Sequence, residues 1–323
     1  MERSVKWYTR YAISLFIVVL AAGCGDDPLE KPGNYGVYTS GYISIPNPEH
    51  PDEPILAKIF APSSDGGATI AQGRFEVVIF MPGFGATFDF YEMYTSHLAS
   101  HGSVVIAMNF IISAGFDGNH DYLARQTTYA VDYAVACGGL LEGHIDPSKI
   151  AAAGHSLGGK IAFYAAAIDP RISVVMAMDP SNGGGPPCFV SEEWCNAYPV
   201  APNVHTGAIG MLDEVAAASF IMRAAPDTFN PDPQSNAEHF FYGLDGQGLH
   251  GVRPPALYFD MGPSGHASWL FLGKNLNVPR ISGRTMVAWL KSHFHGASLD
   301  AYFTGEIVQE DIDAGYIVSV ETR

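Results

Sequence analysis

The segment Gly154–Gly159, with the sequence GHSLGG, constrains the fold of this 323-residue chain more than any other feature. It lies between a small apolar run, Ile150–Ala153, and a segment predicted to be helical, Lys160–Ile168. A Gly-x-Ser-x-Gly motif between a strand and a helix is typical of a sharp turn, the nucleophile elbow, in which small residues let the two elements approach closely. The hydroxyl of Ser156 would project above the edge of a sheet at a helix N-terminus, where negative charge is stabilised. The motif therefore predicts the chemistry of a serine nucleophile on an α/β fold.

Apolar runs of strand length alternate with helical segments along most of the chain. The predicted strands are 35–45, 55–61, 75–81, 104–110, 172–178, 220–224 and 256–261, and the predicted helices are 90–101, 122–136 and 279–295. This alternation indicates an α/β fold, a doubly wound and mostly parallel sheet flanked by helices. The Gly- and Pro-rich residues 180–218 predict a loop insertion near the C-terminal edge of the sheet, where α/β proteins bind ligands.

A serine hydroxyl needs a base and an orienting carboxylate to act as a nucleophile. On this type of fold the serine, the acid and the histidine follow one another in that order along the chain. His266 comes directly after the last predicted central strand and is the predicted base. Two aspartates, Asp179 and Asp227, end neighbouring strands, and either could serve as the acid or begin a turn instead. The sequence favours Asp179 and leaves Asp227 as the alternative.

An oxyanion formed at Ser156 would need two preorganised hydrogen-bond donors. The amide of Leu157 is the first predicted donor. The second comes from the loop 82–86 (PGFGA), with the amide of Phe84 preferred over that of Gly85. Aromatic side chains that indicate an apolar acyl or alcohol pocket are expected at the same edge of the predicted sheet: Phe84, Phe88, Phe90, Tyr91, Tyr94, Phe110, Trp194 and Trp269.

From about residue 35 to residue 296 the chain resembles the α/β-hydrolase superfamily, near the chlorophyllases, the platelet-activating-factor acetylhydrolases and the bacterial cutinase-like polyester hydrolases. The stretches GHSLGGKIAF (154–163), SHLASHG (96–102) and MDP (178–180) look chlorophyllase-like, although chlorophyllases carry Arg where Leu157 stands. The resemblance implies a catalytic role for His266, which matches the catalytic histidine of all three groups.

The three groups differ in the position of the acid. In chlorophyllases and the acetylhydrolases it matches Asp179, and in the polyester hydrolases it matches Asp227. The loop 82–86 looks like the oxyanion loop of the polyester hydrolases. Those enzymes usually carry Trp at the position of Ser181 and Met at the position of Leu157, and neither residue is present here.

The motifs and the resemblance together imply a serine carboxylic ester hydrolase. The expected substrate is an apolar small-molecule or lipid-like ester, cleaved through an acyl-enzyme without a cofactor. Three alternatives remain open: a polyester or cutin hydrolase, an amidase or peptidase of the same fold, and a non-catalytic lipoprotein that only binds a ligand.

Residues 1–24 have the pattern of a signal peptide. Three basic residues precede an apolar run, 12–20, that is short for a membrane span. The following residues, AAGC (21–24), resemble a bacterial lipobox with Cys24 as the lipid-bearing residue, although Ala21 stands where a larger aliphatic is usual. We therefore expect an exported lipoprotein, held to the membrane at the bacterial cell envelope by this anchor. A soluble secreted protein and an uncleaved anchor are the alternatives.

The polar residues 25–36 are predicted to form a flexible tether, and residues 37–323 a single domain. Export would permit disulfides. Cys188 and Cys195, close together in the predicted insertion, are the expected pair, which leaves Cys137 free.

The net charge of −16 argues against a nucleic-acid partner, because phosphates require a basic surface. The segment Asp117–Asp121 (DGNHD) begins like a calcium-binding loop. However, Tyr122 replaces the required glycine and Thr128 stands where a bidentate glutamate belongs. We predict that this segment caps the following helix, and we expect no metal site.

Overall fold

The computed structural model describes residues 27–110, 119–136, 138–182, 200–202, 208–227, 237–270 and 275–323. The predicted signal peptide with Cys24 lies outside these ranges, as do Cys137, Cys188, Cys195 and most of the predicted insertion. Within the described ranges, no helix has both the length and the apolar character needed to cross a membrane.

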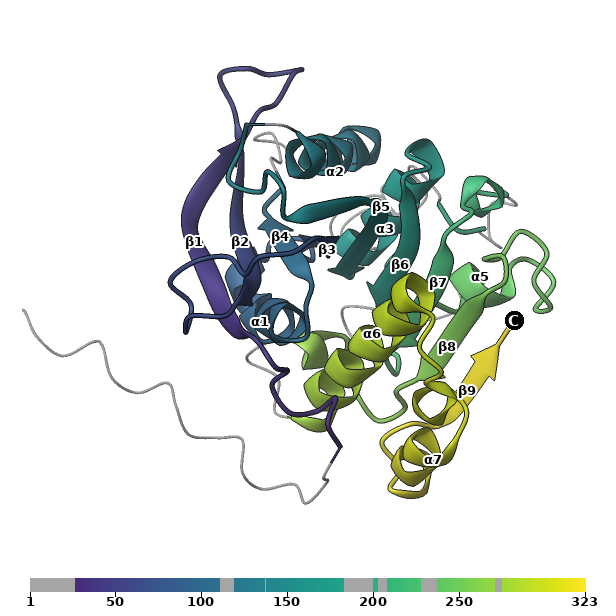
Figure 1. Cartoon of the computed structure of the whole chain (residues 1–323). Helices are drawn as coiled ribbons and strands as arrows, with labels where there is room; N and C mark the ends of the chain where they lie inside the picture. The colour runs from purple at the N-terminus through teal and green to yellow at the C-terminus, as the bar shows by residue number, and fades with distance from the viewer. Residues whose placement is uncertain are drawn as a thin grey trace, which may run out of the picture.

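The described residues form a nine-stranded sheet in the order β1-β2-β4-β3-β5-β6-β7-β8-β9 (Figure 1). The strands are β1 Gly36–Ile45, β2 Ile55–Ser63, β3 Phe75–Met81, β4 Val104–Met108, β5 Ile145–His155, β6 Ile172–Met178, β7 Ala218–Arg223, β8 Ala256–Asp260 and β9 Ser319–Thr322. Neighbouring strands from β4 to β8 are parallel, whereas β1, β2 and β9 pair antiparallel at the two edges. The predicted doubly wound, mostly parallel α/β sheet is confirmed.

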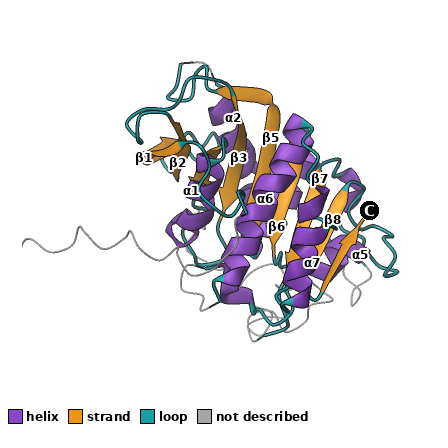
Figure 2. Cartoon of the chain, turned by 60° about the horizontal axis from the view of Figure 1, so that its bottom comes forward, coloured by secondary structure: helices purple, strands orange, loops and turns teal. Residues whose placement is uncertain are grey.

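Helices cover both faces of the sheet. They are α1 Glu92–Ser100, α2 His120–Val135, α3 Leu157–Ile168, α5 Ala237–Tyr242, α6 Asn277–His295 and α7 Glu306–Asp313. Apolar residues of α2, α3 and α5 share one core cluster, and those of α1, α6 and α7 share a second cluster on the opposite face. Figure 2 shows α1, α6 and α7 lying in front of the strands.

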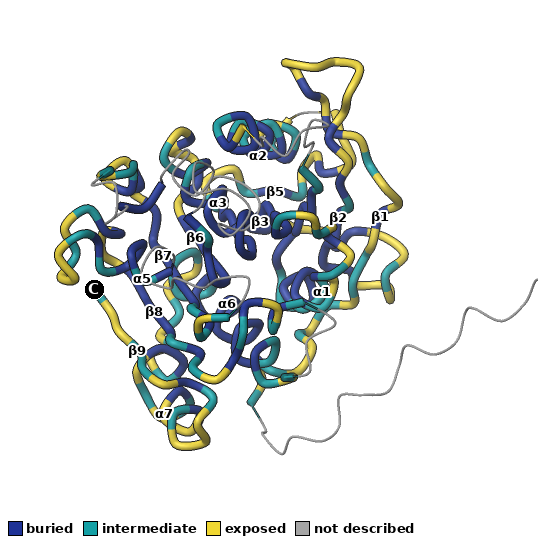
Figure 3. The backbone as a smooth tube through the Cα atoms, turned by 180° about the vertical axis from the view of Figure 1, so that it is seen from behind, coloured by how far each residue is buried: buried dark blue, intermediate teal, exposed yellow. Residues whose placement is uncertain are grey.

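Strand β3 illustrates why the central strands read as continuous apolar runs. All seven of its residues are buried. Val77 and Ile79 pack into the core under α2 and α3, while Val78 and Phe80 pack into the core under α1 and α6. Successive side chains of a strand point to opposite faces, so a strand covered on both faces needs apolar residues at every position. Figure 3 shows the buried central strands between more exposed helices and loops.

Three short elements in the last third of the chain, α5, α7 and β9, have a weaker sequence pattern and were not predicted. Strand β9 has only four residues, half of them exposed, and pairs antiparallel with β8. Helix α5 has six residues and α7 has eight. A short, half-exposed edge strand has too few apolar positions to show an alternating pattern.

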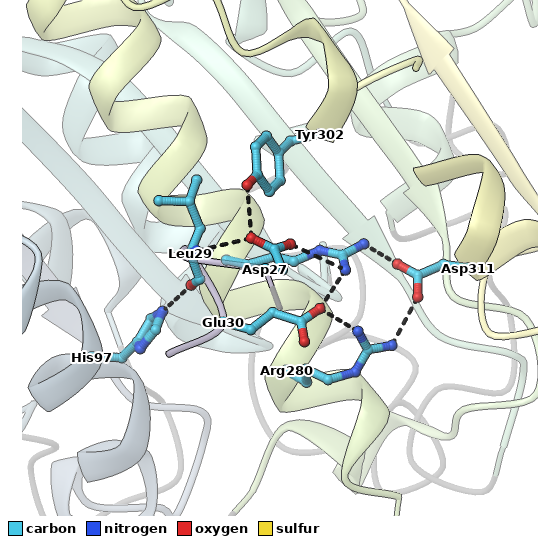
Figure 4. Close-up of polar contacts among 8 residues, drawn as sticks. Asp27, Leu29, Glu30, His97, Arg280, Tyr302 and Asp311 are labelled. Atoms are coloured by element: carbon cyan, nitrogen blue, oxygen red, sulfur yellow. Dashed lines mark hydrogen bonds and ion pairs between the residues drawn. The ribbon is translucent and has the colours of Figure 1, made fainter. Parts of the chain in front are cut away.

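The described part of the predicted tether, residues 27–36, differs from the expectation of a flexible segment. Leu29 is buried in the core under α1 and α6, and its carbonyl accepts a hydrogen bond of 2.9 Å from Nε2 of His97 in α1. Asp27 accepts a hydrogen bond of 2.7 Å from the hydroxyl of Tyr302 (Figure 4). This segment therefore packs against the domain instead of linking to it loosely.

An ion-pair network completes this contact. Glu30 pairs with both Arg280 and Arg284 of α6, and Asp311 of α7 pairs with the same two guanidinium groups (Figure 4). The Arg284 side chain is 3% exposed, whereas that of Arg280 is 29% exposed. The polar composition of the segment predicted a solvated tether. Its ion-pair partners in α6 lie about 250 residues away in the sequence, so the local sequence does not show them.

Candidate active site

The turn between β5 and α3 has the predicted elbow conformation. Ser156 lies between these elements with φ 55° and ψ −119°, a left-handed backbone that side-chain-bearing residues rarely adopt. A Cβ atom on Gly158 would lie 2.2 Å from the carbonyl oxygen of Met81, and one on Gly154 would lie 2.5 Å from the carbonyl carbon of Gly158. The two glycines of the motif therefore allow the close approach of α3, β5 and the end of β3.

The structure brings Ser156, His266 and Asp179 together at the C-terminal edge of the sheet. His266, in the loop after β8, has Nε2 2.8 Å from Oγ of Ser156 and Nδ1 2.5 Å from Oδ2 of Asp179. Asp179 directly follows β6 and is fully buried. Its second oxygen, Oδ1, accepts a hydrogen bond of 2.9 Å from the amide of Ala224. Both oxygens of this carboxylate are thus bound, which fixes the orientation of the imidazole ring.

Asp227, the alternative acid, contacts a different part of the same histidine. Its Oδ2 accepts a hydrogen bond of 2.7 Å from the backbone amide of His266, whereas the ring nitrogens face Asp179 and Ser156. A Cβ atom on Gly265 would lie 2.8 Å from the same oxygen, so a glycine is needed for this approach. The geometry therefore assigns the ring contact to Asp179 and the backbone contact to Asp227.

The two carboxylates also affect the basicity of the histidine. Burial alone would lower the pKa of His266, but the hydrogen bond and charge of Asp179, together with the charge of Asp227, raise it above its ordinary value. A base at this position would accept a proton more readily than a histidine in water and would hold the resulting charge beside a buried carboxylate.

Both predicted oxyanion donors belong to segments that flank Ser156. Leu157 is the first residue of α3. In the loop 82–86, a Cβ atom on Gly83 would lie 3.3 Å from Cβ of Ser156, so the residue before Phe84 is in contact distance of the serine. The loop turns back at this point, since the amide of Ala86 donates to the carbonyl of Gly83 at 3.1 Å.

No polar role was predicted from the sequence for His155, or for Tyr91, which was named only as part of the aromatic pocket. Nδ1 of His155 lies 2.9 Å from the hydroxyl oxygen of Tyr91, which accepts a hydrogen bond of 3.0 Å from the amide of Gly83. On the other side of the ring, Nε2 of His155 lies 2.9 Å from the carbonyl oxygen of His266. A histidine inside a buried elbow was itself a usable signal, because buried polar groups almost always have partners.

The predicted aromatic pocket is only partly described. Phe88, Tyr91, Tyr94 and Trp269 are buried in the core under α1 and α6. Phe84, Phe90 and Phe110 are half-buried, and Trp194 lies outside the described residues. Of the described aromatic residues in the predicted pocket, only these three phenylalanines remain accessible from outside the core.

Among the described residues, no group of three His, Cys, Asp or Glu side chains is placed to hold a metal ion. The part of the segment 117–121 that is described acts as a helix cap. The side chain of Asn119 accepts a hydrogen bond of 3.2 Å from the amide of Tyr122 at the start of α2. The predicted capping role is confirmed.

Comparison with known proteins gives two matches. A sequence model of the chlorophyllase family matches residues 33–235, which is well over half of the chain. Chlorophyllase-2 of Arabidopsis thaliana is 26% identical over 268 residues, which covers 75% of this chain and 81% of the plant protein. The family match contains Ser156, Asp179 and Asp227, while His266 lies beyond its last residue.

Proposed function

Because this chain belongs to the chlorophyllase family, with the fold of an α/β-hydrolase, we propose that it is a serine carboxylic ester hydrolase that forms an acyl-enzyme. The family supports an ester hydrolase acting on a small molecule. The observation that carries the finer proposal is the continuous hydrogen-bonded chain from Ser156 through His266 to the buried Asp179.

In the proposed first step, Oγ of Ser156 attacks the ester carbonyl carbon while Nε2 of His266 accepts its proton. Asp179 holds Nδ1–H and stabilises the imidazolium that forms. The raised pKa of His266 supports this step, because the charged ring is the product of the proton transfer. The amides of Leu157 and Phe84 are proposed to bind the oxyanion of the tetrahedral intermediate.

His266 then returns the proton to the alkoxide leaving group, and the alcohol departs from the acyl-enzyme. A water molecule enters, gives a proton to the same nitrogen, and attacks the acyl carbon. When the second intermediate collapses, Nε2 of His266 returns this proton to Oγ of Ser156. The carboxylic acid is released and Ser156 is restored. The half-buried Phe84, which follows Gly83 beside Ser156, supports an apolar ester as the substrate.

The test is hydrolysis of p-nitrophenyl esters of increasing acyl length by the chain from Gly25 onward. Ser156→Ala is expected to lower kcat by about 10⁶-fold and Asp179→Asn by about 10⁴-fold, the sizes known for other serine hydrolases. Asp227→Asn keeps an oxygen that can accept from the amide of His266, so we expect a loss of about tenfold or less.

These two aspartate variants are matched controls for each other. Loss of activity in Asp227→Asn with survival in Asp179→Asn would reverse the assignment and favour the arrangement of polyester hydrolases. Full activity in Ser156→Ala would refute the mechanism. A parent chain that neither turns over esters nor reacts with a fluorophosphonate would instead be a ligand-binding protein, and preference for anilides over esters would indicate an amidase.

We also propose that the chain is exported and anchored through a lipid on Cys24, on the strength of the signal-peptide pattern and the lipobox-like residues 21–24. Full-length chain expressed in bacteria with a labelled fatty acid should carry the label in the membrane fraction. Cys24→Ser should remove the label, whereas Cys137→Ser should leave it unchanged. Label on the Cys24→Ser variant, or none on the parent, would contradict the anchor.

A further inference from the structure

His155 occupies a position that links the two halves of the site. It ends β5, next to Ser156, and only 3% of the residue is exposed. Its ring lies between the hydroxyl of Tyr91 on one side and the backbone carbonyl of His266 on the other, each at 2.9 Å. The ring also packs against that of His266, with the centroids 4.7 Å apart.

The partners of this ring determine its tautomer. The carbonyl oxygen of His266 can only accept a hydrogen bond, so Nε2 of His155 must carry a proton and donate it. A neutral ring then has a lone pair on Nδ1, which must accept from the hydroxyl of Tyr91. The hydroxyl oxygen of Tyr91 accepts in turn from the amide of Gly83. In this row of three hydrogen bonds, every donor therefore faces one acceptor.

The surroundings keep His155 neutral. Burial, and then the positive charge that His266 can carry, lower the pKa of His155 to about 3, although the nearby Asp179 acts in the opposite direction. Tyr91 is the titratable group hydrogen-bonded to the ring, and burial raises its pKa well above its ordinary value. Over the neutral pH range, both groups thus remain uncharged hydrogen-bonding partners.

This row of hydrogen bonds connects two groups whose positions matter for the proposed reaction. Gly83 immediately precedes Phe84, a proposed oxyanion donor, and a Cβ atom on Gly83 would lie 3.2 Å from both Nδ1 of His155 and the hydroxyl of Tyr91. At the other end, the carbonyl of His266 is bound by His155 while its amide is bound by Asp227. Both backbone polar groups of His266 are therefore held by side chains.

We propose that Tyr91 and His155 are positioning residues that hold the oxyanion loop and the backbone of His266 in one fixed relation, with His155 as the neutral Nε2–H tautomer. This inference rests on the proposed function for its effect on catalysis. The tautomer itself depends only on the hydrogen-bond geometry.

The first test compares kcat and KM of variants in the full-length chain. Tyr91→Phe removes the hydroxyl and with it two hydrogen bonds, to His155 and from the amide of Gly83. It is expected to lower kcat by about 10- to 100-fold, with KM changed less than about twofold. His155→Phe removes both contacts and should lower kcat by about 10²-fold. His155→Gln has an amide nitrogen near the place of Nε2 that can donate to His266, so it should recover kcat to within about fivefold of the parent.

Tyr94→Phe is the matched control. Tyr94 is also buried and also packs on Phe80, but its hydroxyl has no hydrogen-bond partner among the described residues. Because Tyr94 is buried in the core under α1 and α6 and does not line an accessible pocket, the kcat of Tyr94→Phe should equal that of the parent. Equal kcat in Tyr91→Phe and Tyr94→Phe would overturn the positioning role, as would a His155→Gln variant no better than His155→Phe.

The second test needs no turnover. In full-length chain with ¹⁵N-labelled histidines, the imidazole signals lost in His155→Gln should belong to an Nε2–H tautomer that does not titrate between pH 5 and 8. An Nδ1–H tautomer, or titration in that range, would overturn the inference. A parent chain that fluorophosphonate fails to label would refute the proposed function and the catalytic role with it, while this spectrum would still decide the tautomer.

Discussion

Replacing Arg284 by Met is expected to destabilise the protein much more than the same replacement at Arg280. Both guanidinium groups contact the carboxylates of Glu30 and Asp311. In addition, Arg284 lies 3.8 Å from Asp27, and Arg280 lies over the ring of Tyr316. The two arginines differ in burial, with 3% of the Arg284 side chain and 29% of the Arg280 side chain exposed. Methionine keeps the apolar stem of the side chain in each case, so the main change in each variant is the loss of the guanidinium group.

The magnitude follows from the carboxylates left behind. Asp311 is 5% exposed and Glu30 is 13% exposed as side chains. Breaking a buried ion pair and leaving its partner uncompensated costs about 3–5 kcal/mol. Because Arg280 would still contact both carboxylates, we expect the lower end of this range, about 3 kcal/mol, for Arg284→Met. A partly exposed pair contributes about 1 kcal/mol or less, which is our expectation for Arg280→Met.

Urea unfolding followed by circular dichroism measures the difference. With a slope near 3 kcal/mol/M, about the upper end for urea, Arg284→Met should lower the midpoint by about 1 M. Arg280→Met should lower it by about 0.3 M or less. Equal shifts in the two variants, or a shift below about 0.3 M for Arg284→Met, would show that burial does not decide the strength of this network.

Three further outcomes are expected. Gly158→Ala should lower the free energy of unfolding by about 1–3 kcal/mol in urea and slow fluorophosphonate labelling, because the new Cβ would lie 2.2 Å from the carbonyl oxygen of Met81. Activity requires the neutral ring of His266, so the acid limb of kcat/KM should reflect a pKa above 6.5. Because the charge of Asp227 helps to raise this pKa, Asp227→Asn should move the acid limb to lower pH. An acid limb that does not move would contradict the role of this charge. Burial, and then a neighbouring histidine, lower the pKa of His97 from 6.5 to about 4, so the unfolded chain binds more protons in that interval and stability should decrease as pH falls through it. His97→Gln should reduce the difference between the urea midpoints at pH 7 and pH 5. If the difference is unchanged, the pH dependence of stability comes from other groups.

The sequence predicted the parts of the site that depend on local pattern. The strand, turn and helix around Ser156 follow from small residues and apolar runs that are adjacent in the chain. His266 could be placed after the last central strand because the order of the functional groups is a property of the fold. Both predictions needed only neighbouring residues and a topology.

The choice between Asp179 and Asp227 needed three-dimensional distances. Both residues follow adjacent parallel strands, so both side chains reach the same edge of the sheet. The local sequence favoured Asp179 but did not exclude Asp227. The structure distinguishes them because one carboxylate reaches the ring of His266 and the other reaches its backbone amide.

The contacts that were missed join segments far apart in the sequence. Tyr91 and His155 are separated by 64 residues, and His155 and His266 by 111 residues. Glu30 and Arg284 are separated by 254 residues. In each case the local sequence shows a polar residue but not its partner, so burial and pairing follow only from the folded arrangement.

The packed N-terminal segment has a consequence for how the domain would sit on a membrane. A free tether of residues 25–36 would reach about 40 Å when fully extended. Because Asp27 is already held at Tyr302, only Gly25 and Asp26 separate the domain from Cys24, a span of about 10 Å at most. A lipid on Cys24 would therefore keep the side of the domain formed by α1, α6 and α7 close to the bilayer. The anchor would then set the orientation of the domain as well as its location.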